Sequence, residues 1–275
     1  MTREDALLVS QLSAVRGGLR VDPDKAYLIE SRLAPVARRE GFESLDDLLA
    51  ALKAQREERL IWAVVEAMTM GETSFFRDAE AFRRFREELL PAAVLRSDGA
   101  PVRIWSAACG SGQEVYSLAM IVDELLSRLP TARVELYASD LNERALEKAQ
   151  TGQYTQFEIQ RGLPIQEVVR HFERDGDMWR LSPRICQMVR WRRINLIGDL
   201  SAIGQFDIIL CRHVMRSLLP EMRPRVLESL ALALSAQGRL ILGEGEDAST
   251  ITPALTALDG VGAVCRRNPD FRIAA

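Results

Sequence analysis

The sequence predicts a helical domain followed by an α/β domain built on a parallel sheet. Two observations support this fold class. The first third has apolar residues at helical spacing and no strand-like alternation, whereas short apolar strands alternate with longer helical segments after Pro101. Such alternation is typical of βαβ units, whose strands lie parallel in one sheet. We place the helical domain at residues 1–68, a linker with a connecting helix at 69–100, and the α/β domain at 101–275.

The helical domain is expected to form a small bundle. Its first helix has apolar residues every three or four positions between Leu7 and Leu19, and the glycine pair at 17–18 frays its end. The second helix opens at the Asp22-Pro23 pair, with the aspartate as N-cap, and runs towards Gly41. Because proline cannot donate the helical hydrogen bond, Pro35 should kink or divide this helix.

Two further helices complete the predicted bundle. Ser44 is expected to cap the helix at 45–53, with Asp47 at the third position of its first turn. An amphipathic stretch covers 57–68. Lys25, Arg32 and Arg39 recur every seven residues, so on an unbroken helix they would share a face that either docks an acidic partner or is only solvated.

The α/β domain is expected to contain four core strands joined by helices. The predicted strands are 102–106, 133–138, 206–211 and 238–242. The predicted helices are 114–129, 142–150 and 220–235. Between the second and third strands, 178–181 and 188–191 look like antiparallel edge strands near an Asp175-Gly176 turn. We therefore expect a small antiparallel β insertion at about 172–194.

Residues 104–114 run from a strand through a turn of small residues into a helix. Small residues, with Gly110 and Gly112 among them, let the backbone pass close to a ligand, and the free N–H groups of a helix N-terminus suit an anionic group. Asp140 ends the next strand, where a carboxylate can accept both hydroxyls of a ribose. The alternative interpretation makes Asp140 the N-cap of the following helix.

This pattern leaves two cofactor classes open, a nicotinamide dinucleotide and S-adenosylmethionine. A dinucleotide site requires a third glycine or alanine in its turn, and Val115 stands at that position. S-adenosylmethionine is therefore favoured. Asn195 and Leu196 precede the next core strand and are suitably placed to border an adenine pocket.

Composition argues against several other classes. The formal net charge is −3 with both signs interspersed, which disfavours nucleic acid and anionic membranes as partners. No apolar run approaches the ~20 residues that span a bilayer, and the N-terminus has no signal-peptide stretch, so we expect a cytoplasmic protein without membrane insertion. The 4 cysteines form no CxxC pair and only 2 histidines are present, so we expect reduced thiols and no metal site.

A series of motifs in this chain resembles, in the same order, the bacterial chemotaxis receptor glutamate methyltransferases (CheR-type). The motifs are ETSFFR at 72–77, IWSAAC at 104–109, EVYSLAM at 114–120, ASD at 138–140, GQY at 152–154, RGLP at 161–164, NL at 195–196, FDIILCR at 206–212 and GRLILG at 238–243. The resemblance covers nearly the whole chain.

The resemblance implies a class I methyltransferase (Rossmann-like) sheet with a small antiparallel β insertion, preceded by a helical domain. It also implies methyl transfer from S-adenosylmethionine to glutamate side chains on the cytoplasmic helices of chemoreceptors, by a protein that we expect to be a monomer. The candidate cofactor positions that match the family are Thr73, Arg77, Glu114, Asp140, Asn195, Leu196 and Arg212. The loop glycines Gly110 and Gly112 are candidates too, as is His213, which replaces an asparagine at a position resembling a cofactor contact. Because a glutamate is already anionic at pH 7, no general base is needed, and Arg77 is the candidate catalytic residue that holds a carboxylate in line.

The chain departs from the family on the side where the methyl group would react. Residues 213–218 read HVMRSL where the family has Asn-Val-Leu-Ile-Tyr-Phe, so Ser217 replaces a tyrosine and His213 an asparagine. Gly71 replaces another asparagine, and 243–246 read GEGE in place of Gly-His-Ser-Glu. Two functions therefore stay open: an active receptor methyltransferase, or a degenerate relative that binds S-adenosylmethionine or a signalling partner with little or no turnover.

Overall fold

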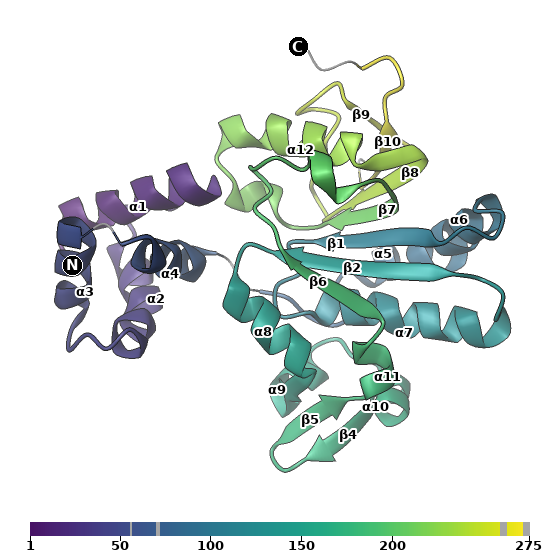
Figure 1. Ribbon diagram of the computed structural model, residues 1–275, viewed down its shortest axis with the longest axis horizontal. Coiled ribbons are helices and arrows are strands. Elements are labelled where there is room, and N and C mark those ends of the chain that lie inside the picture. Colours follow the sequence, from purple (N-terminus) through teal and green to yellow (C-terminus); the bar gives the residue numbers. More distant parts are fainter. Residues whose placement is uncertain (56, 70–71, 259–262, 272–275) are drawn as a thin grey trace.

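The structure is a computed structural model that describes residues 1–55, 57–69, 72–258 and 263–271, so Gly71 lies outside the described residues. A helical domain stands beside a larger domain built on a twisted sheet, and a small second sheet projects from the latter (Figure 1). The fold class predicted from the sequence is confirmed: an all-α domain, then a mixed sheet with a separate small antiparallel sheet.

The helical domain packs four amphipathic segments around one apolar core. Its described helices are α1 (Arg3–Gly17), α2 (Ala26–Arg39), α3 (Leu45–Gln55) and α4 (Glu58–Met68). Val9, Leu33, Leu48 and Val64 each bury their whole side chain in that core. As predicted, the Ser44 hydroxyl accepts the N–H of Asp47 at 3.1 Å and caps α3.

One prediction about the second helix is wrong, and of the two outcomes predicted for Pro35, a kink or a division, the structure excludes the division. Asp22 does not cap it: its carboxylate accepts the N–H of Asp24 in a local turn, and the helix begins three residues after Pro23. The helix is also not divided at Pro35, which lies inside α2. Pro35 is exposed, whereas Leu33 and Val36 beside it are buried in the core, and this apolar face keeps the helix continuous despite one missing hydrogen bond.

Among the described residues the main sheet has seven strands in the order β6-β2-β1-β7-β8-β10-β9. Its parallel strands are β1 (Val102–Ala107), β2 (Val134–Asp140), β6 (Val189–Arg193), β7 (Phe206–Cys211) and β8 (Leu234–Leu242). β10 (Val264–Arg267) runs antiparallel to β8 and to β9 (Leu255–Ala257). The chain order reverses between β1 and β7, and ligands of such sheets bind beyond the carboxyl ends of the strands at this switch point.

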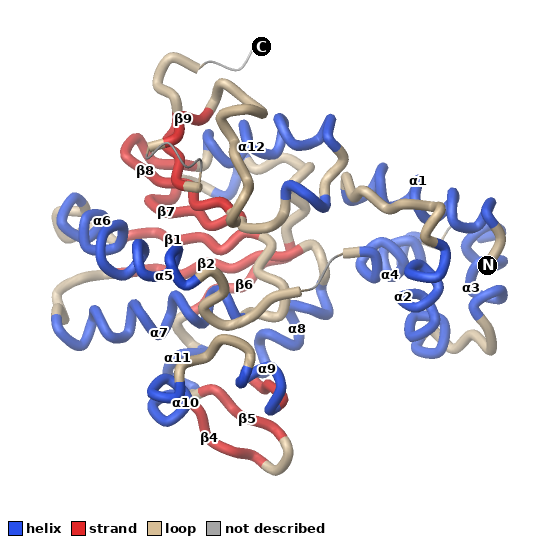
Figure 2. Tube along the Cα trace, turned by 180° about the vertical axis from the view of Figure 1, so that it is seen from behind, coloured by secondary structure: helices blue, strands red, loops and turns tan. Residues whose placement is uncertain are grey.

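Helices flank the strands, as Figure 2 shows from behind. The predicted helices correspond to α7 (Gln113–Arg128), α8 (Glu143–Thr151) and α12 (Arg223–Leu232). β8 begins at Leu234 rather than at Gly238, so the last predicted helix was too long at its end. The other described helical segments are α5 (Ala79–Arg84), η1 (Phe85–Leu89), α6 (Leu90–Arg96), α9 (Gln156–Gln160), α10 (Ile165–His171), α11 (Pro183–Cys186), η2 (Ser201–Ile203), η3 (Met215–Ser217) and η4 (Pro220–Met222).

The predicted composition of the β insertion is partly wrong. The small sheet pairs β5 (Met178–Leu181) with β4 (Phe172–Asp175) and with β3 (Gln153–Thr155), which the sequence analysis missed. Residues 188–191 do not join it, because β6 is instead the parallel edge strand beside β2, with Trp191 opposite Ala138. A short strand has the same alternation in either role, and packing decides: the Trp191 ring stacks edge-on against Tyr116 of α7 at 5.6 Å.

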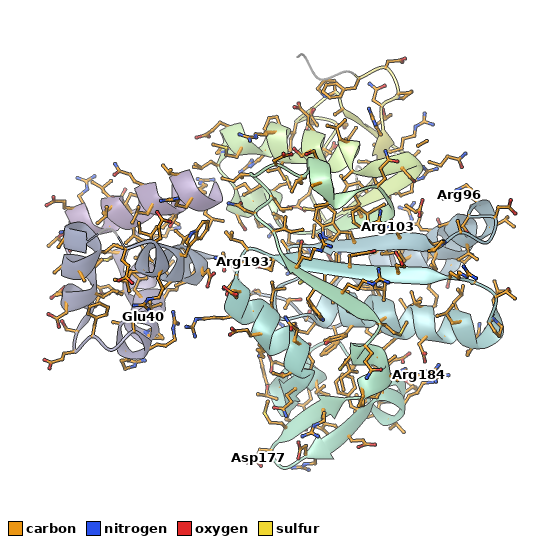
Figure 3. All side chains as sticks on the ribbon, viewed as in Figure 1. Glu40, Arg96, Arg103, Asp177, Arg184 and Arg193 are labelled. Carbon is orange, nitrogen blue, oxygen red and sulfur yellow. The ribbon has the colours of Figure 1, made fainter. Side chains whose placement is uncertain are left out.

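The helical domain contacts the carboxyl edge of the sheet. The Asn195 amide donates to the carbonyl of Arg16 at 2.7 Å, and Leu19 forms a backbone bridge with Leu218. Arg193, which lies between the domains in Figure 3, forms a 2.8 Å ion pair with Glu66 of α4. These contacts close the open end of the sheet with residues from the N-terminal third of the chain.

Candidate functional site

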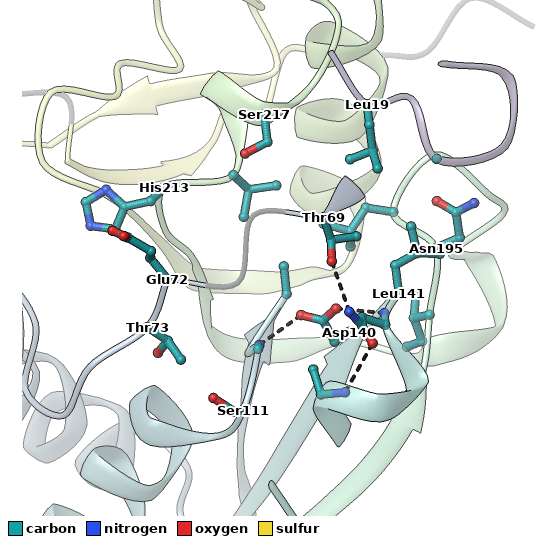
Figure 4. A pocket seen from close by; sticks show the side chains of 18 of the residues that line it. Leu19, Thr69, Glu72, Thr73, Ser111, Asp140, Leu141, Asn195, His213 and Ser217 are labelled. Atoms are coloured by element: carbon teal, nitrogen blue, oxygen red, sulfur yellow. Dashed lines mark hydrogen bonds between the residues drawn. The ribbon is translucent and has the colours of Figure 1, made fainter. Parts of the chain in front are cut away.

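A cavity of about 360 Å³ lies at this edge, between the two domains (Figure 4). Its walls come from the end of α1, the interdomain linker, the loop after β1, the end of β2, the segment after β6 and the loop after β7. Its position at the switch point of the sheet and its size are those of a small-molecule site.

The loop after β1 reaches the cavity through a strained backbone. Ala108 and Gly110 have φ values of 58° and 57°, in the left-handed region, and both line the cavity. Gly112 does not line it. With φ at 92°, Gly112 packs against α8, where an added Cβ would lie 2.9 Å from the Cβ of Ala149. Gly112, which the sequence predicts as a cofactor residue, therefore lies at a packing contact with α8 and not in the cavity wall.

Asp140 stands at the end of β2 and is 8% exposed. Its Oδ2 accepts the N–H of Gly110 and its Oδ1 accepts the N–H of Asn142, each at 2.8 Å. Asn142 is the N-cap of α8, so the alternative interpretation of Asp140 as that N-cap is wrong. Burial raises the pKa of Asp140 above its usual value. Because each carboxylate oxygen has a second lone pair, Asp140 can still accept two hydroxyl groups of a ligand.

Arg212 follows β7 and anchors a buried ionic network. Its side chain is 1% exposed and donates to Glu114 at 3.0 Å and to Asp78 at 2.7 Å. Burial would raise the pKa of Asp78, but Arg212 and His213 outweigh it and hold that pKa below its usual value. The Nε of Arg212 is buried and has no hydrogen-bond partner among the described residues. The Nε–H of Arg212 is therefore a buried donor that no described protein group pairs with.

The loop that carries the altered motif is rigidly held. His213 has φ at 61°, and its Nε2 lies 2.7 Å from Asp78 while its Nδ1 lies 3.2 Å from Arg216. The Glu246 carboxylate accepts the N–H groups of His213 and Met215 at 2.8 and 2.9 Å. Because both ring nitrogens of His213 have protein partners, its contacts are those of a structural histidine.

The structure brings most of the predicted site residues together. Those that line the cavity are Thr73, Gly110, Asp140, Asn195, Leu196, Arg212 and His213. Glu114 lies behind Arg212 and also accepts the Ser106 hydroxyl at 2.8 Å. Arg77 lies outside the lining, where its Nη1 donates to the carbonyl of Glu72 at 2.9 Å.

Sequence reasoning missed the wall that the helical domain provides. Gly17 and Leu19 line the cavity, with Thr69 from the linker and with Ser111 and Lys148 from the sheet domain. No local pattern marks Leu19 as a site residue, because its place depends on how the two domains dock. Within the described residues, no group of three or more His, Cys, Asp or Glu side chains is placed to hold a metal, and no helix is long and apolar enough to cross a membrane.

Comparison with known families shows which family this chain belongs to. Residues 8–69 match the CheR methyltransferase all-alpha domain, and residues 71–260 match the CheR methyltransferase SAM binding domain. The chain belongs to the CheR methyltransferase family. Its sheet domain is therefore the class I methyltransferase fold that the sequence predicts, and its cofactor is S-adenosylmethionine.

Three relatives each match most of the chain. The chemotaxis protein methyltransferase Cher2 of Pseudomonas putida is 34% identical, over 83% of this chain and 85% of its own length. Chemotaxis protein methyltransferase 1 of Pseudomonas aeruginosa is 36% identical over 83% and 85%, and the chemotaxis protein methyltransferase of Vibrio parahaemolyticus is 36% identical over 86% of each chain.

The residues of the cavity suit this cofactor chemically. Asp140 offers acceptor lone pairs for the hydroxyls of a ribose. The Nε–H of Arg212, which has no partner among the described residues, offers a buried donor for an anionic or polar group. The volume of about 360 Å³ falls in the range of cavities that enclose a cofactor.

Proposed function

We propose that this protein transfers a methyl group from S-adenosylmethionine to glutamate side chains on the cytoplasmic helices of chemoreceptors. The observation that carries the proposal is the placement of Asp140, Arg212 and Asn195 around one cavity at the switch point, in a chain with both domains of the CheR family. The three relatives described above are named chemotaxis protein methyltransferases, which supports a chemoreceptor as substrate and a cytoplasmic setting.

In this proposal the cavity walls hold the cofactor from several sides. Asp140 accepts the ribose hydroxyls, Asn195 and Leu196 border the adenine, and Thr73 and Gly110 flank the remainder. The bound cofactor supplies a methyl group on a positively charged sulfur. The catalytic role of Arg77 stays a prediction: its guanidinium donates to Glu72 beside the cavity, and it would have to turn inward to hold a carboxylate.

The reaction requires alignment rather than proton transfer. Asp140, Asn195 and Leu196 would hold the cofactor, and the cavity would have to place an acceptor carboxylate in line with the methyl group, which the cofactor would supply while its sulfur kept the electron pair. The carboxylate is anionic at pH 7, so no base is needed, in accord with a His213 whose ring nitrogens both face protein partners. Orientation of the two reactants in the cavity and exclusion of water around them then account for the rate enhancement.

Two measurements test the function. Calorimetric titration with S-adenosylhomocysteine is expected to give a dissociation constant in the micromolar range, about −8 kcal/mol. Purified chemoreceptor cytoplasmic fragments, incubated with methyl-labelled S-adenosylmethionine, are expected to gain base-labile methyl ester label that is lost when their glutamates are replaced by alanine. Binding without any label on receptor fragments would favour the second candidate, a relative that binds the cofactor with little turnover, which the replacement at Ser217 supports.

We expect a substitution at Ser217 to change turnover and to leave cofactor affinity nearly unchanged. Its half-buried side chain lines the cavity in a loop fixed by Glu246, and space lies on both sides of it. We expect Ser217→Tyr to raise kcat roughly tenfold, about 1.4 kcal/mol in the barrier, because a wall next to the reacting methyl group acts mainly in the transition state.

The Ser217 series has internal controls. The dissociation constant of S-adenosylhomocysteine should stay within twofold for Ser217→Tyr, and Ser217→Phe separates the ring from the hydroxyl. An unmodified protein that turns over rapidly, with no gain or a loss in Ser217→Tyr, would show that another group fills this role.

A further inference from the structure

Two residues at which this chain departs from the family motif contact each other. They are His213 and Arg216, which stand in the places of an asparagine and an isoleucine. Nη2 of the arginine lies 3.2 Å from Nδ1 of the histidine, and Nε2 of the same ring lies 2.7 Å from Oδ2 of Asp78. The three side chains therefore form one chain of hydrogen bonds, Asp78–His213–Arg216.

The direction of these hydrogen bonds follows from the donors that each group has. Arginine has N–H donors and no acceptor, so Nδ1 of His213 accepts from Arg216. The neutral ring then carries its proton on Nε2, which donates to Asp78. The Asp78 carboxylate thus fixes the tautomer of His213 that can accept from Arg216, and the imidazole ring fixes the direction of the guanidinium.

The backbone that carries Arg216 is held by a buried carboxylate. Arg216 is the middle residue of η3, and Glu246 accepts the N–H groups of His213 and Met215 at 2.8 and 2.9 Å. His213 and Ser217, on either side of Arg216 in the chain, both line the cofactor cavity (Figure 4). Arg216 therefore stands at the rim of that cavity on a fixed turn.

Arg216 differs from the cations of the cavity wall in that its charge is not yet paired. It is exposed, and its guanidinium has no carboxylate partner in the part of the chain that the structure describes. A guanidinium has five N–H donors, so those not used by His213 can bind a carboxylate. The lysine and arginine side chains that line the cavity all have carboxylate partners: Arg212 with Asp78 and Glu114, Arg144 with Glu40, and Lys148 with Glu158.

An acceptor carboxylate at this cavity meets two carboxylates that are already there. Glu72 and Asp140 both line the cavity, and like charges at close range repel. Arg161 lies 3.6 Å from the Glu72 carboxylate and so is paired as well. A third carboxylate is stabilised by a cation that has no carboxylate partner, and Arg216 is such a cation at the rim.

We propose that Arg216 is a catalytic residue of this chain, which binds the acceptor carboxylate at the rim of the cofactor cavity, and that His213 and Asp78 position its guanidinium. One oxygen of the carboxylate is held by the guanidinium, and the other faces the cavity. This inference rests on the proposed function. The altered motif then supplies a substrate contact at Arg216, on the same turn where Ser217 leaves space.

The test compares Arg216→Ala and Arg216→Lys with Arg225→Ala in the full chain. Arg225 is a matched control, an exposed arginine of α12 that lies outside the cavity lining and has no polar partner within the described ranges. With a purified chemoreceptor cytoplasmic fragment as acceptor, we expect Arg216→Ala to lower kcat/KM about tenfold or more. Arg216→Lys should fall between, because lysine keeps the charge but lacks the planar fork, and Arg225→Ala should match the unmodified protein.

Guanidinium ions separate a lost contact from a damaged fold. We expect guanidinium chloride, at concentrations far below those that unfold proteins, to restore part of the kcat/KM of Arg216→Ala and to leave Arg225→Ala unchanged. Sodium chloride at the same ionic strength is the control. All variants should bind S-adenosylhomocysteine within about twofold of the unmodified protein. A loss of kcat/KM that guanidinium does not restore, with equally weakened S-adenosylhomocysteine binding, would overturn the inference.

Direct binding tests the contact with the carboxylate itself. Fluorescence anisotropy measures how tightly each variant, saturated with S-adenosylhomocysteine, binds fragments in which one glutamate at a time is replaced by glutamine. We expect at least one replacement to weaken binding to the unmodified protein and to Arg225→Ala about tenfold, and to leave binding to Arg216→Ala unchanged. The same loss in all three proteins would place Arg216 away from the acceptor carboxylate.

His213→Asn tests the positioning role. Asparagine is too short to join Asp78 to Arg216, so the guanidinium loses its fixed direction. We expect kcat/KM to fall by less than in Arg216→Ala, and to fall no further when the two changes are combined, a coupling that a double-mutant cycle measures. Additive losses would overturn the role of His213 as a residue that acts through Arg216.

The binding assay keeps this inference distinct from the proposed function. If the unmodified protein binds the fragment without methylating it, the proposed function fails, and the glutamine replacements still decide for or against Arg216. Methylation at equal rates by Arg216→Ala and Arg225→Ala would leave the proposed function standing and overturn the role of Arg216. Absence of both binding and methylation would overturn both proposals.

Discussion

Replacing Asp140 with alanine is expected to weaken the binding of S-adenosylhomocysteine at least tenfold, about 1.4 kcal/mol or more. The carboxylate is buried and accepts the N–H groups of Gly110 and Asn142, which leaves one lone pair on each oxygen for the ribose hydroxyls. The change removes the acceptor for the ligand and also the tether of the glycine loop. Calorimetric titration of the variant measures the loss.

Asp140→Asn separates these two effects. The amide oxygen keeps one of the two backbone N–H groups and the amide nitrogen faces the other, so we expect a smaller loss of stability than in Asp140→Ala, together with weaker ligand binding because the charge is gone. Urea unfolding establishes that each variant is folded before it is titrated. Normal ligand binding by a folded Asp140→Ala protein would rule out the ribose assignment.

Replacing Arg212 with methionine is expected to lower the free energy of unfolding by about 3–5 kcal/mol. The guanidinium is almost fully buried, and its removal leaves the largely buried carboxylate of Glu114 without its counter-ion and that of Asp78 with His213 alone. For a chain of this size, such a loss corresponds to a fall in melting temperature of roughly 10 °C. The cation also packs over the Phe82 ring at 5.3 Å, so the variant loses packing as well as charge.

The pH dependence of unfolding gives an independent readout of this network. The pKa of Asp78 is lowered in the folded protein, so Asp78 contributes stability at pH values above its ordinary pKa and loses it as the pH falls through the lowered value. Without Arg212 that pKa should rise, and the acid unfolding limb should move to higher pH. Adding Asp78→Asn to Arg212→Met should restore part of the stability, whereas additive losses would show that the two groups act separately.

Much of the fold was accessible from local sequence. One continuous unit contains the strand at 102–107, the small-residue turn after it and the helix from Gln113. The residue pattern that predicts each of these elements lies within the element itself or a few residues from it. The same holds for β7, whose apolar run has the bounds that were predicted. Asp140 was found because it ends a predicted strand, and parallel strands present their carboxyl ends at one edge.

Other elements depended on partners that are distant in the sequence. The alternation around Trp191 suits an antiparallel insertion or a parallel edge strand equally, and only its packing on Tyr116 and pairing with β2 choose between them. Gly112 stands in the predicted turn, yet the close approach of α8 gives it a packing position. Neither contact can be predicted from the conformational preferences of the neighbouring residues alone.

By itself the sequence determined the fold class, the cofactor class and the residues at the strand ends, because each of these depends on periodicity or motifs within a short segment. The tertiary structure alone decided which residues from the helical domain complete the site. Leu19 lines it because its neighbours Gly18 and Arg20 form backbone hydrogen bonds with residues 217–219, about 200 positions away. It also placed Arg77 outside the cavity lining and Ser217 at a junction between two spaces, since such positions follow from domain docking and not from local chain preference.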